Sequence, residues 1–383
     1  LIKMGWSTQE RIDEIVKADT AEPTLYQGEQ LRRRQLAIGT TMEELETILQ
    51  PMIEDGAAMC EFYAWFEAAL ISAQNGGESI TELTIDERLS AARAKRSGFV
   101  GLSFSTIAGF NANGAMPHYR ATDESHAVIA GDGLLLIDSG GQYLGGTTDV
   151  TRVWPIGTVS AAMKRDFTLV LKGMMNLSRA RFPRATLSPM LDALARAPLW
   201  AEGIEFGHGT GHGVGYFLNV HEGPQSISKA VPDAHMAMEP GMITSIEPGV
   251  YRAGQWGVRI ENLVLNVSAT TAEGSSFAEF LEFETLTLCP IDTRCIDMAL
   301  MRDDECAWLN AYHATVRNRV APRVSGAALA WLMRKPAVTA PIIGASKMGH
   351  LEDALHSMEL KLEPEEVAAL EGKYVPHAIS GHN

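Results

Sequence analysis

The chain has few cysteines, and none of them forms a CxxC pair. Only four occur in 383 residues, at positions 60, 289, 295 and 306. Scattered cysteines in a chain of this length indicate reduced thiols rather than a disulfide framework. We therefore expect a cytoplasmic protein.

Basic charge and long apolar runs are also in short supply. Lys and Arg number 32 against 47 Asp and Glu, a net charge of −15. This balance argues against a nucleic-acid partner or an anionic membrane surface. No stretch is long and apolar enough to span a bilayer, and the first residues, LIKMGWSTQER, lack a signal-peptide pattern. Hydrophobic residues still make up 46 %, enough for a sizeable core.

Helical and strand-like segments alternate in an order that occurs twice. Each time, two segments with helical spacing of apolar residues precede a β-hairpin. The pattern predicts an α+β fold with an internal duplication. The expected helices cover residues 41–55, 56–72, 84–96, 160–182 and 188–203, and the chain is helical again after 303. The expected strands cover residues 134–137, 147–153, 241–251, 257–267 and 278–292.

Two aspartates stand eleven residues apart in the first hairpin, IDSGGQYLGGTTDVTR. Such spacing places Asp138 and Asp149 on adjacent antiparallel strands, where opposite side chains lie within roughly 5 Å. They could be aspartates that merely flank a turn. However, a carboxylate at the end of the buried run LLLID is costly without a partner, which favours metal ligation.

Two glutamates repeat this arrangement in the second hairpin. Glu247 in SIEPGVY and Glu261 in RIENLV are flanked by apolar residues, so each carboxylate needs a cation or hydrogen-bond donors. The alternative is a salt bridge to Arg252 or Arg259. Two such hairpins in one chain make ligation the better interpretation.

Histidines complete the set of candidates. His208 and His212 lie in HGTGHGVG, whose glycines favour a loop or strand over the helix of an HExxH zinc site. A histidine here could also be a hydrogen-bonded core residue. His118 in GAMPHYR and His221 in NVHEGP are candidates for hydrogen bonding or proton transfer.

Four carboxylates and one imidazole suit two divalent cations. Two such ions balance four negative charges, whereas one ion leaves a concentrated excess. A donor set with one nitrogen and otherwise oxygen favours Mn²⁺ over Zn²⁺, with Co²⁺ or Zn²⁺ as substitutes. Paired cations generate a hydroxide nucleophile at neutral pH, as amide hydrolysis requires.

With these motifs in this order, residues 55–332 closely resemble the catalytic domain of the Xaa-Pro aminopeptidase (aminopeptidase P) family. The resemblance implies the pita-bread fold shared with methionine aminopeptidase, prolidase and creatinase. It implies a dinuclear Mn²⁺ site in which Asp149 and Glu261 bridge the ions. Asp138 then binds one ion, and His212 and Glu247 bind the other.

The resemblance also implies the reaction. A metal-bridged hydroxide removes the N-terminal residue from peptides whose second residue is proline, and a homodimer is expected. His118, His208 and His221 match positions that line the active site. His221 is expected to stabilise the oxyanion and Glu247 to carry the proton to the leaving nitrogen.

Both ends depart from the family. Residues 1–54 look weakly like a stretch of the glutamate synthase large subunit, and residues 333–383 resemble the C-terminus of aldo-keto reductases. The alternatives are therefore a prolidase-like dipeptidase or an inactive binding module that lacks the N-terminal domains. Binding of NADP through residues 344–347 is unsupported, because no reductase barrel or catalytic set precedes this segment.

Overall fold

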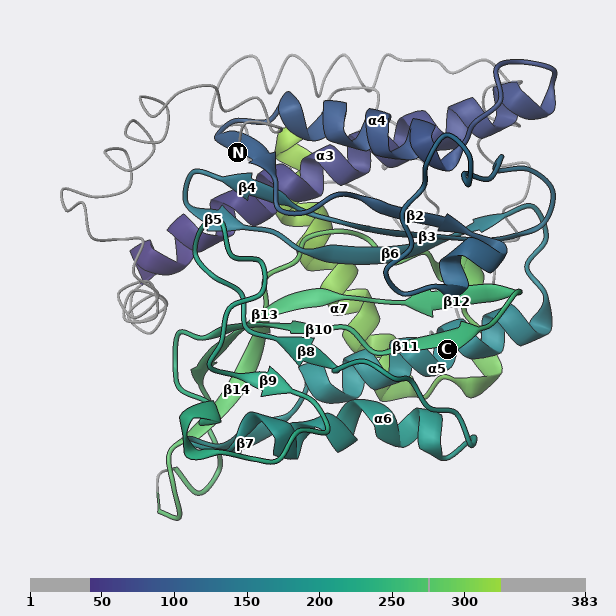
Figure 1. Ribbon diagram of the computed structural model, residues 1–383. Coiled ribbons are helices and arrows are strands. Elements are labelled where there is room, and N and C mark those ends of the chain that lie inside the picture. Colours follow the sequence, from purple (N-terminus) through teal and green to yellow (C-terminus); the bar gives the residue numbers. More distant parts are fainter. Residues whose placement is uncertain (1–41, 275, 325–383) are drawn as a thin grey trace, which may run out of the picture.

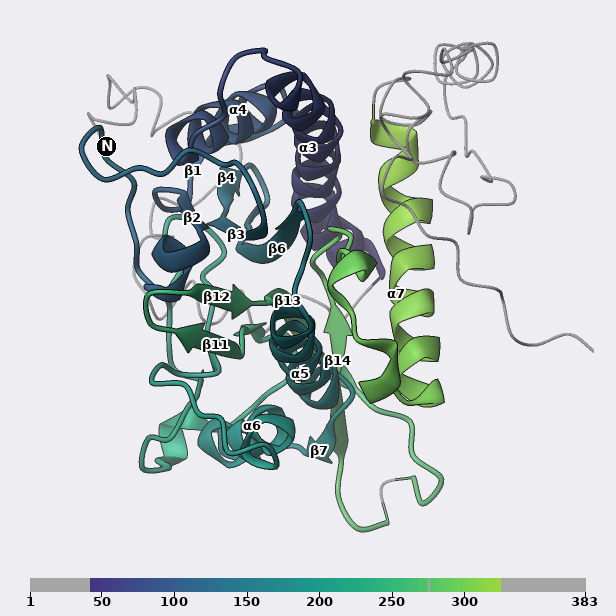
Figure 2. The same cartoon turned by 90° about the vertical axis from the view of Figure 1, so that its right-hand side faces the viewer.

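Helices and antiparallel strands alternate twice along the chain. The structure is a computed structural model that describes residues 42–274 and 276–324 (Figures 1 and 2). The first half contains α3 (Met42–Gln74), α4 (Glu82–Ala94), β1 (Phe99–Leu102), β2 (Ile107–Phe110), β3 (Gly133–Ser139), β4 (Gly141–Tyr143), β5 (Gly146–Thr147) and β6 (Val150–Ile156). The second half contains α5 (Ala161–Ser178), β7 (Arg181–Pro183), α6 (Asp192–Trp200), β8 (Gly211–His212), β9 (Ser226–Ile227), β10 (Ile243–Ile246), β11 (Gly249–Arg252), β12 (Trp256–Arg259), β13 (Asn262–Ser268), β14 (Phe280–Thr285) and α7 (Asp303–Val320). Together they form the expected α+β, pita-bread arrangement.

Each half places its helix pair outside its own sheet. The strands β2, β3 and β6 form one antiparallel sheet, and β10, β13, β14 and β7 form another. In Figure 1, α3 and α4 lie beside the first sheet, while α5 and α6 lie on the far side of the second, so strands occupy the middle. The amide of Glu261 donates to the carbonyl of Thr151 (3.2 Å) and joins the two sheets.

The first hairpin is formed by β3 and β6. We expected Asp138 and Asp149 to lie opposite each other on these strands, and they do not. Asp138 pairs with Thr151, whereas Asp149 lies just before β6. The connecting residues form β4 and β5, which belong to a separate sheet with β1. Both aspartates nevertheless lie at the same end of the hairpin.

The second hairpin is divided into two pairs of strands. The strand β11 pairs with β12, and β10 pairs with β13. The expected single strand over residues 241–251 is interrupted at Glu247 and Pro248, since proline has no N–H to continue the ladder. On the return strand, Ile260 and Glu261 form the matching gap.

The helix α3 is continuous, although two helices were expected there. The second of these was expected to begin at Gly56. In the structure it is a point of close packing, because a Cβ at this position would lie 2.2 Å from the carbonyl oxygen of Leu288. A boundary between residues 54 and 55 therefore falls inside a helix.

The strand expected over residues 278–292 is shorter than predicted. It ends at Thr285, after which the carbonyls of Thr287 and Cys289 accept hydrogen bonds from the hydroxyl of Tyr312 instead of a neighbouring strand. Helix α7, which carries Tyr312, packs along α3 (Figure 2).

Aromatic stacking fastens α3 to the first sheet. The rings of Tyr63 and Trp154 are stacked at 4.2 Å, and the guanidinium of Arg294 lies over the indole. All four cysteines are free thiols, as expected. No helix in the described part of the chain has the length and apolarity needed to cross a bilayer. The stretches that resemble glutamate synthase and aldo-keto reductases lie mostly or wholly outside the described residues.

Candidate metal centre and substrate cavity

One cavity of about 390 Å³ lies where the two halves meet. Its size suits a small ligand or the end of a peptide. The eight residues singled out in the sequence all line it: His118, Asp138, Asp149, His208, His212, His221, Glu247 and Glu261. Phe104, Ile107 and Pro117 add an apolar section of wall.

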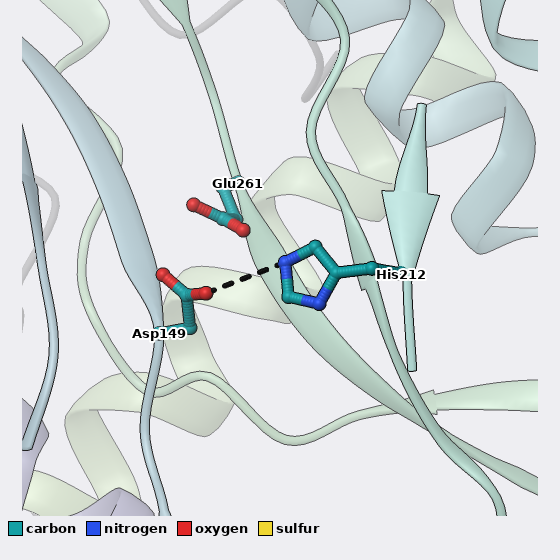
Figure 3. A group of neighbouring side chains, drawn as sticks. All are labelled: Asp149, His212 and Glu261. Carbon is teal, nitrogen blue, oxygen red and sulfur yellow. Dashed lines mark ion pairs between the residues drawn. The ribbon is translucent and has the colours of Figure 1, made fainter. Parts of the chain in front are cut away.

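The four carboxylates reach the cavity from ends and interruptions of strands. Asp138 is near the end of β3 and Asp149 precedes β6, while Glu247 and Glu261 occupy the two gaps of the second hairpin. Asp149, His212 and Glu261 form the centre of the cluster. One ligand atom from each lies within 4.8 Å of the other two, and Figure 3 shows the three side chains converging.

The imidazole of His212 is oriented for ligation. Its Nδ1 lies 3.0 Å from the carbonyl oxygen of Gly213, so this nitrogen carries the proton. Nε2 then presents its lone pair, 3.5 Å from Oδ2 of Asp149 and 3.4 Å from Oε1 of Glu247. The hydrogen bond that holds the proton on Nδ1 thus selects the tautomer that a metal ion needs at Nε2.

Burial makes this collection of acids costly. It raises the pKa values of Asp149 and Glu261 well above their usual range, and the neighbouring carboxylates raise them further. The Oδ1 atoms of Asp138 and Asp149 are buried and accept no hydrogen bond from residues 42–274 or 276–324. Buried acceptor oxygens that converge without donors are the donor set of a site for hard divalent cations. The residues therefore fit two such ions.

One arginine, Arg259, shares the cavity with the acids. We considered Arg252 and Arg259 only as alternative partners of the glutamates. Arg252 in fact pairs with Asp166 at 2.9 Å, and Arg259 binds Asp138 and lies 4.0 Å from Glu247. A single guanidinium cannot neutralise four carboxylates, so the need for further cations remains.

A chain of hydrogen bonds connects this arginine to His208. Arg259 Nη1 donates to the hydroxyl of Tyr251 (2.8 Å), which lies 2.8 Å from Nε2 of His208. Burial lowers the pKa of His208 to about 4, so its ring is neutral at pH 7. Tyr251 was not singled out from the sequence. Its spacing of four residues from Glu247 in an expected strand was a signal, because residues an even number apart lie on the same face of a strand.

The remaining two histidines face the cluster from different loops. The ring of His221 lies edge-to-face against that of His212, with centroids 4.2 Å apart, and burial lowers its pKa. His118 is exposed and also lines the cavity. The cavity is thus lined by four carboxylates and four histidines.

Family models match most of the described chain. The model described as metallopeptidase family M24 matches residues 46–267, and the model for the C-terminal region of peptidase M24 matches residues 279–341. Together these matches cover both halves and α7.

Two curated proteins are similar in sequence to this chain over most of its length. A probable Xaa-Pro aminopeptidase P of Laccaria bicolor is 43 % identical over 294 residues, which are 76 % of this chain and 45 % of that protein. Aminopeptidase P2 of Arabidopsis thaliana is 43 % identical over 283 residues, 74 % of this chain and 39 % of that protein. The chain spans about half the length of the curated relatives it matches.

Among solved structures, the X-prolyl aminopeptidase of Caenorhabditis elegans superposes with a TM-score of 0.71 at 36 % identity. The superposition covers 80 % of this chain and 49 % of that protein, which is described as a cytosolic enzyme with a di-nuclear active site. The X-Pro aminopeptidase of Thermotoga maritima gives a TM-score of 0.52 at 28 % identity, with 69 % of this chain and 66 % of that protein covered.

Proposed function

Because the chain belongs to metallopeptidase family M24, we propose that it is a dinuclear metallo-aminopeptidase that releases the N-terminal residue from peptides with proline in the second position. One observation carries the proposal: four carboxylates and a histidine with a free Nε2 converge in one cavity. The relatives named as Xaa-Pro aminopeptidases support the substrate class.

Five side chains would hold the ions. We assign Asp149 and Glu261 as the bridging ligands, Asp138 to one ion, and His212 and Glu247 to the other. When bound, the two ions supply a hydroxide nucleophile at neutral pH and polarise the scissile carbonyl. The oxygen-rich donor set favours Mn²⁺, with Co²⁺ or Zn²⁺ as substitutes.

The chain's own hydrogen bonds prepare these ligands. Thr151 donates its hydroxyl to Oε2 of Glu261 (2.7 Å), and Ser245 donates to Oε1 of Glu247 (3.2 Å). Each bond restricts the rotamer of one carboxylate.

Glu247 and the cavity histidines would provide acid–base catalysis and hydrogen bonding. Burial raises the pKa of Glu247, which suits it to take up a proton and deliver it to the departing prolyl nitrogen. This delivery matters because the secondary amine of proline is a poor leaving group until it is protonated. His221 would donate a hydrogen bond to the developing oxyanion, and His118 and His208 would bind the peptide.

The four carboxylates in the cavity also explain why an aminopeptidase is the expected class. A free α-ammonium group is attracted to a site with four acids and one arginine, whereas the interior of a peptide carries no such charge. A cytoplasmic location agrees with the four free thiols, and we propose a homodimer.

The test is metal analysis combined with hydrolysis of a Xaa-Pro-Yaa tripeptide. Asp149→Asn removes a proposed bridging charge and should abolish both hydrolysis and the binding of the second ion. Asp233→Asn, on an exposed aspartate, is the matched control and should leave both unchanged. Hydrolysis by Asp149→Asn at the wild-type rate would refute the assignment.

A series of peptide lengths separates the alternatives. Cleavage of Xaa-Pro tripeptides and longer peptides is expected for an aminopeptidase. Cleavage of Xaa-Pro dipeptides alone would identify a prolidase-like dipeptidase. Stoichiometric peptide binding without turnover, with both ions bound, would identify an inactive binding module.

A further inference from the structure

His118 reaches the cavity from a loop, not from a strand or helix. We call residues 111–127, between β2 and the segment that pairs with residues 80–82, the His118 loop. No hydrogen bond or ion pair from the described part of the chain holds the imidazole itself. The position of this ring must therefore be set by whatever fixes the loop.

A buried glutamate on the outer side of the loop provides that fixation. Glu82, the first residue of α4, is fully buried. Its Oε1 accepts from the amide of Phe110 (2.6 Å), and its Oε2 accepts from the amide of Ala127 (2.8 Å). One carboxylate thus ties together the two ends of the loop.

The same carboxylate also binds the middle of the loop. Asn113 Nδ2 lies 3.1 and 3.0 Å from the two carboxylate oxygens of Glu82, and the hydroxyl of Tyr119 lies 2.8 Å from Oε2. Tyr119 directly follows His118 and is buried, whereas His118 is exposed toward the cavity. The anchored residue and the functional residue are therefore neighbours in the chain.

A counterpart occurs in the second half. Asp192, the first residue of α6, is buried and accepts from Thr210 Oγ1 (2.6 Å) and from Arg196 Nε (2.6 Å). Arg196 in turn donates to the carbonyl of His208 (2.8 Å). In both halves, a buried acid that opens the second helix holds the loop bearing a cavity histidine.

We propose that Glu82 is a positioning residue that holds His118 at the wall of the substrate cavity by binding both ends and the middle of the His118 loop. Its carboxylate is suited to this role because it can accept four hydrogen bonds at once and lies at the positive end of a helix. It touches neither substrate nor ions. The activity it supports rests on the proposed function.

The change Glu82→Gln tests this with little change in shape. Each carboxylate oxygen accepts from a backbone N–H, so whichever oxygen becomes an NH₂ group faces a donor. The loop should shift, while the packing of Gly114 against Gly257 in β12 still holds its first residues in place. Tyr119→Phe, which removes one donor, serves if Glu82→Gln does not fold.

The matched control is Glu305→Gln. Glu305 is equally buried and accepts from Lys172 Nζ (2.6 Å) and the amide of Arg302 (2.9 Å) at the start of α7, away from the cavity. A general loss of stability would appear in both variants. A loss that acts through His118 would appear only in the Glu82 variant.

The first readout does not depend on peptidase activity. In a ¹H–¹³C spectrum of histidine-labelled protein with diamagnetic Zn²⁺, the His118 signal is the one missing from His118→Ala. Glu82→Gln should shift or broaden this signal and leave that of His313 unchanged, whereas Glu305→Gln should not affect it. An unchanged His118 signal in Glu82→Gln would overturn the proposal.

The second readout is a double-mutant cycle on kcat/KM for a Xaa-Pro tripeptide. Glu82→Gln should lower kcat/KM roughly 10- to 100-fold in the wild-type background, as expected for a misplaced binding group. In the His118→Ala background its effect should fall below about twofold, because coupled residues are not additive. Equal losses in both backgrounds would refute the proposal. If the wild type does not hydrolyse the peptide, the proposed function fails and the spectrum alone decides this inference.

Discussion

Replacing Arg152 should destabilise the protein far more than replacing an arginine on its surface. The Arg152 side chain is buried between the two halves, and no carboxylate in the described ranges pairs with it. Oxygen acceptors surround its guanidinium instead. They are the carbonyls of Thr151 (2.8 Å), Glu261 (2.7 Å), Cys289 (2.7 Å) and Pro290 (3.1 Å), Oδ1 of Asn262 (2.8 Å) and the hydroxyl of Tyr312 (2.8 Å).

The magnitude follows from the acceptors left behind. Arg152→Met keeps an unbranched side chain but removes every donor, and each buried acceptor without a partner costs about 1–3 kcal/mol. Removal of a buried charge recovers some desolvation energy, and the hydroxyl of Tyr312 has other partners. We expect a net loss of about 4 kcal/mol, which corresponds to a decrease in Tm of roughly 5 °C for a chain of 383 residues.

Urea unfolding followed by tryptophan fluorescence measures this loss, with Arg184→Met as the control. Arg184 is half exposed and pairs with Glu239 and Glu279 at the surface, where such pairs contribute about 0–1 kcal/mol. Metal content should also fall in Arg152→Met, because Arg152 holds the backbone of Glu261. A loss no larger than that of the control would refute the reasoning.

Three further predictions concern single groups. Burial lowers the pKa of His313 to about 4, so the native state binds fewer protons than the unfolded state between about pH 4 and 6.5. The stability of the wild type should therefore decrease by roughly 3 kcal/mol as pH falls through this window, and that of His313→Gln should decrease less. Urea midpoints at several pH values measure the difference. The hydroxyl of Tyr63 is buried and has no hydrogen-bond partner among the described residues, so Tyr63→Phe should leave the stability unchanged or raise it by up to about 1 kcal/mol. A loss of stability of more than about 1 kcal/mol would contradict this reasoning. Tyr251→Phe removes the group between His208 and Arg259 and should lower kcat/KM roughly tenfold or more with little change in Tm; unchanged kinetics would remove this chain of hydrogen bonds from the mechanism.

The site could be located from the sequence because its residues violate local rules. Asp138 ends a run of buried leucines, and Glu247 interrupts an apolar strand, so each needed a partner that its neighbours could not supply. Arg259 looked like such a partner and was assigned to the competing interpretation. The structure shows that it belongs to the cavity together with the acids.

The details that sequence reasoning missed depend on contacts between distant segments. Gly56 was expected to begin a second helix, and only the approach of Leu288 explains why glycine is needed there. Glu82 precedes the helix expected over residues 84–96, and its local sequence does not mark it as functional. Its role depends on Phe110 and Ala127, which lie 28 and 45 residues further along the chain.

The duplication explains why the cavity lies where it does. Each half contributes one hairpin with two acids and at least one cavity histidine, and neither half alone gathers enough ligands for two ions. The halves are joined at the cluster itself, where the amide of Glu261 binds the carbonyl of Thr151 and the hydroxyl of Thr151 binds the carboxylate of Glu261. A change that loosens this contact therefore separates the ligands, so stability and metal binding should decline together in variants at the junction.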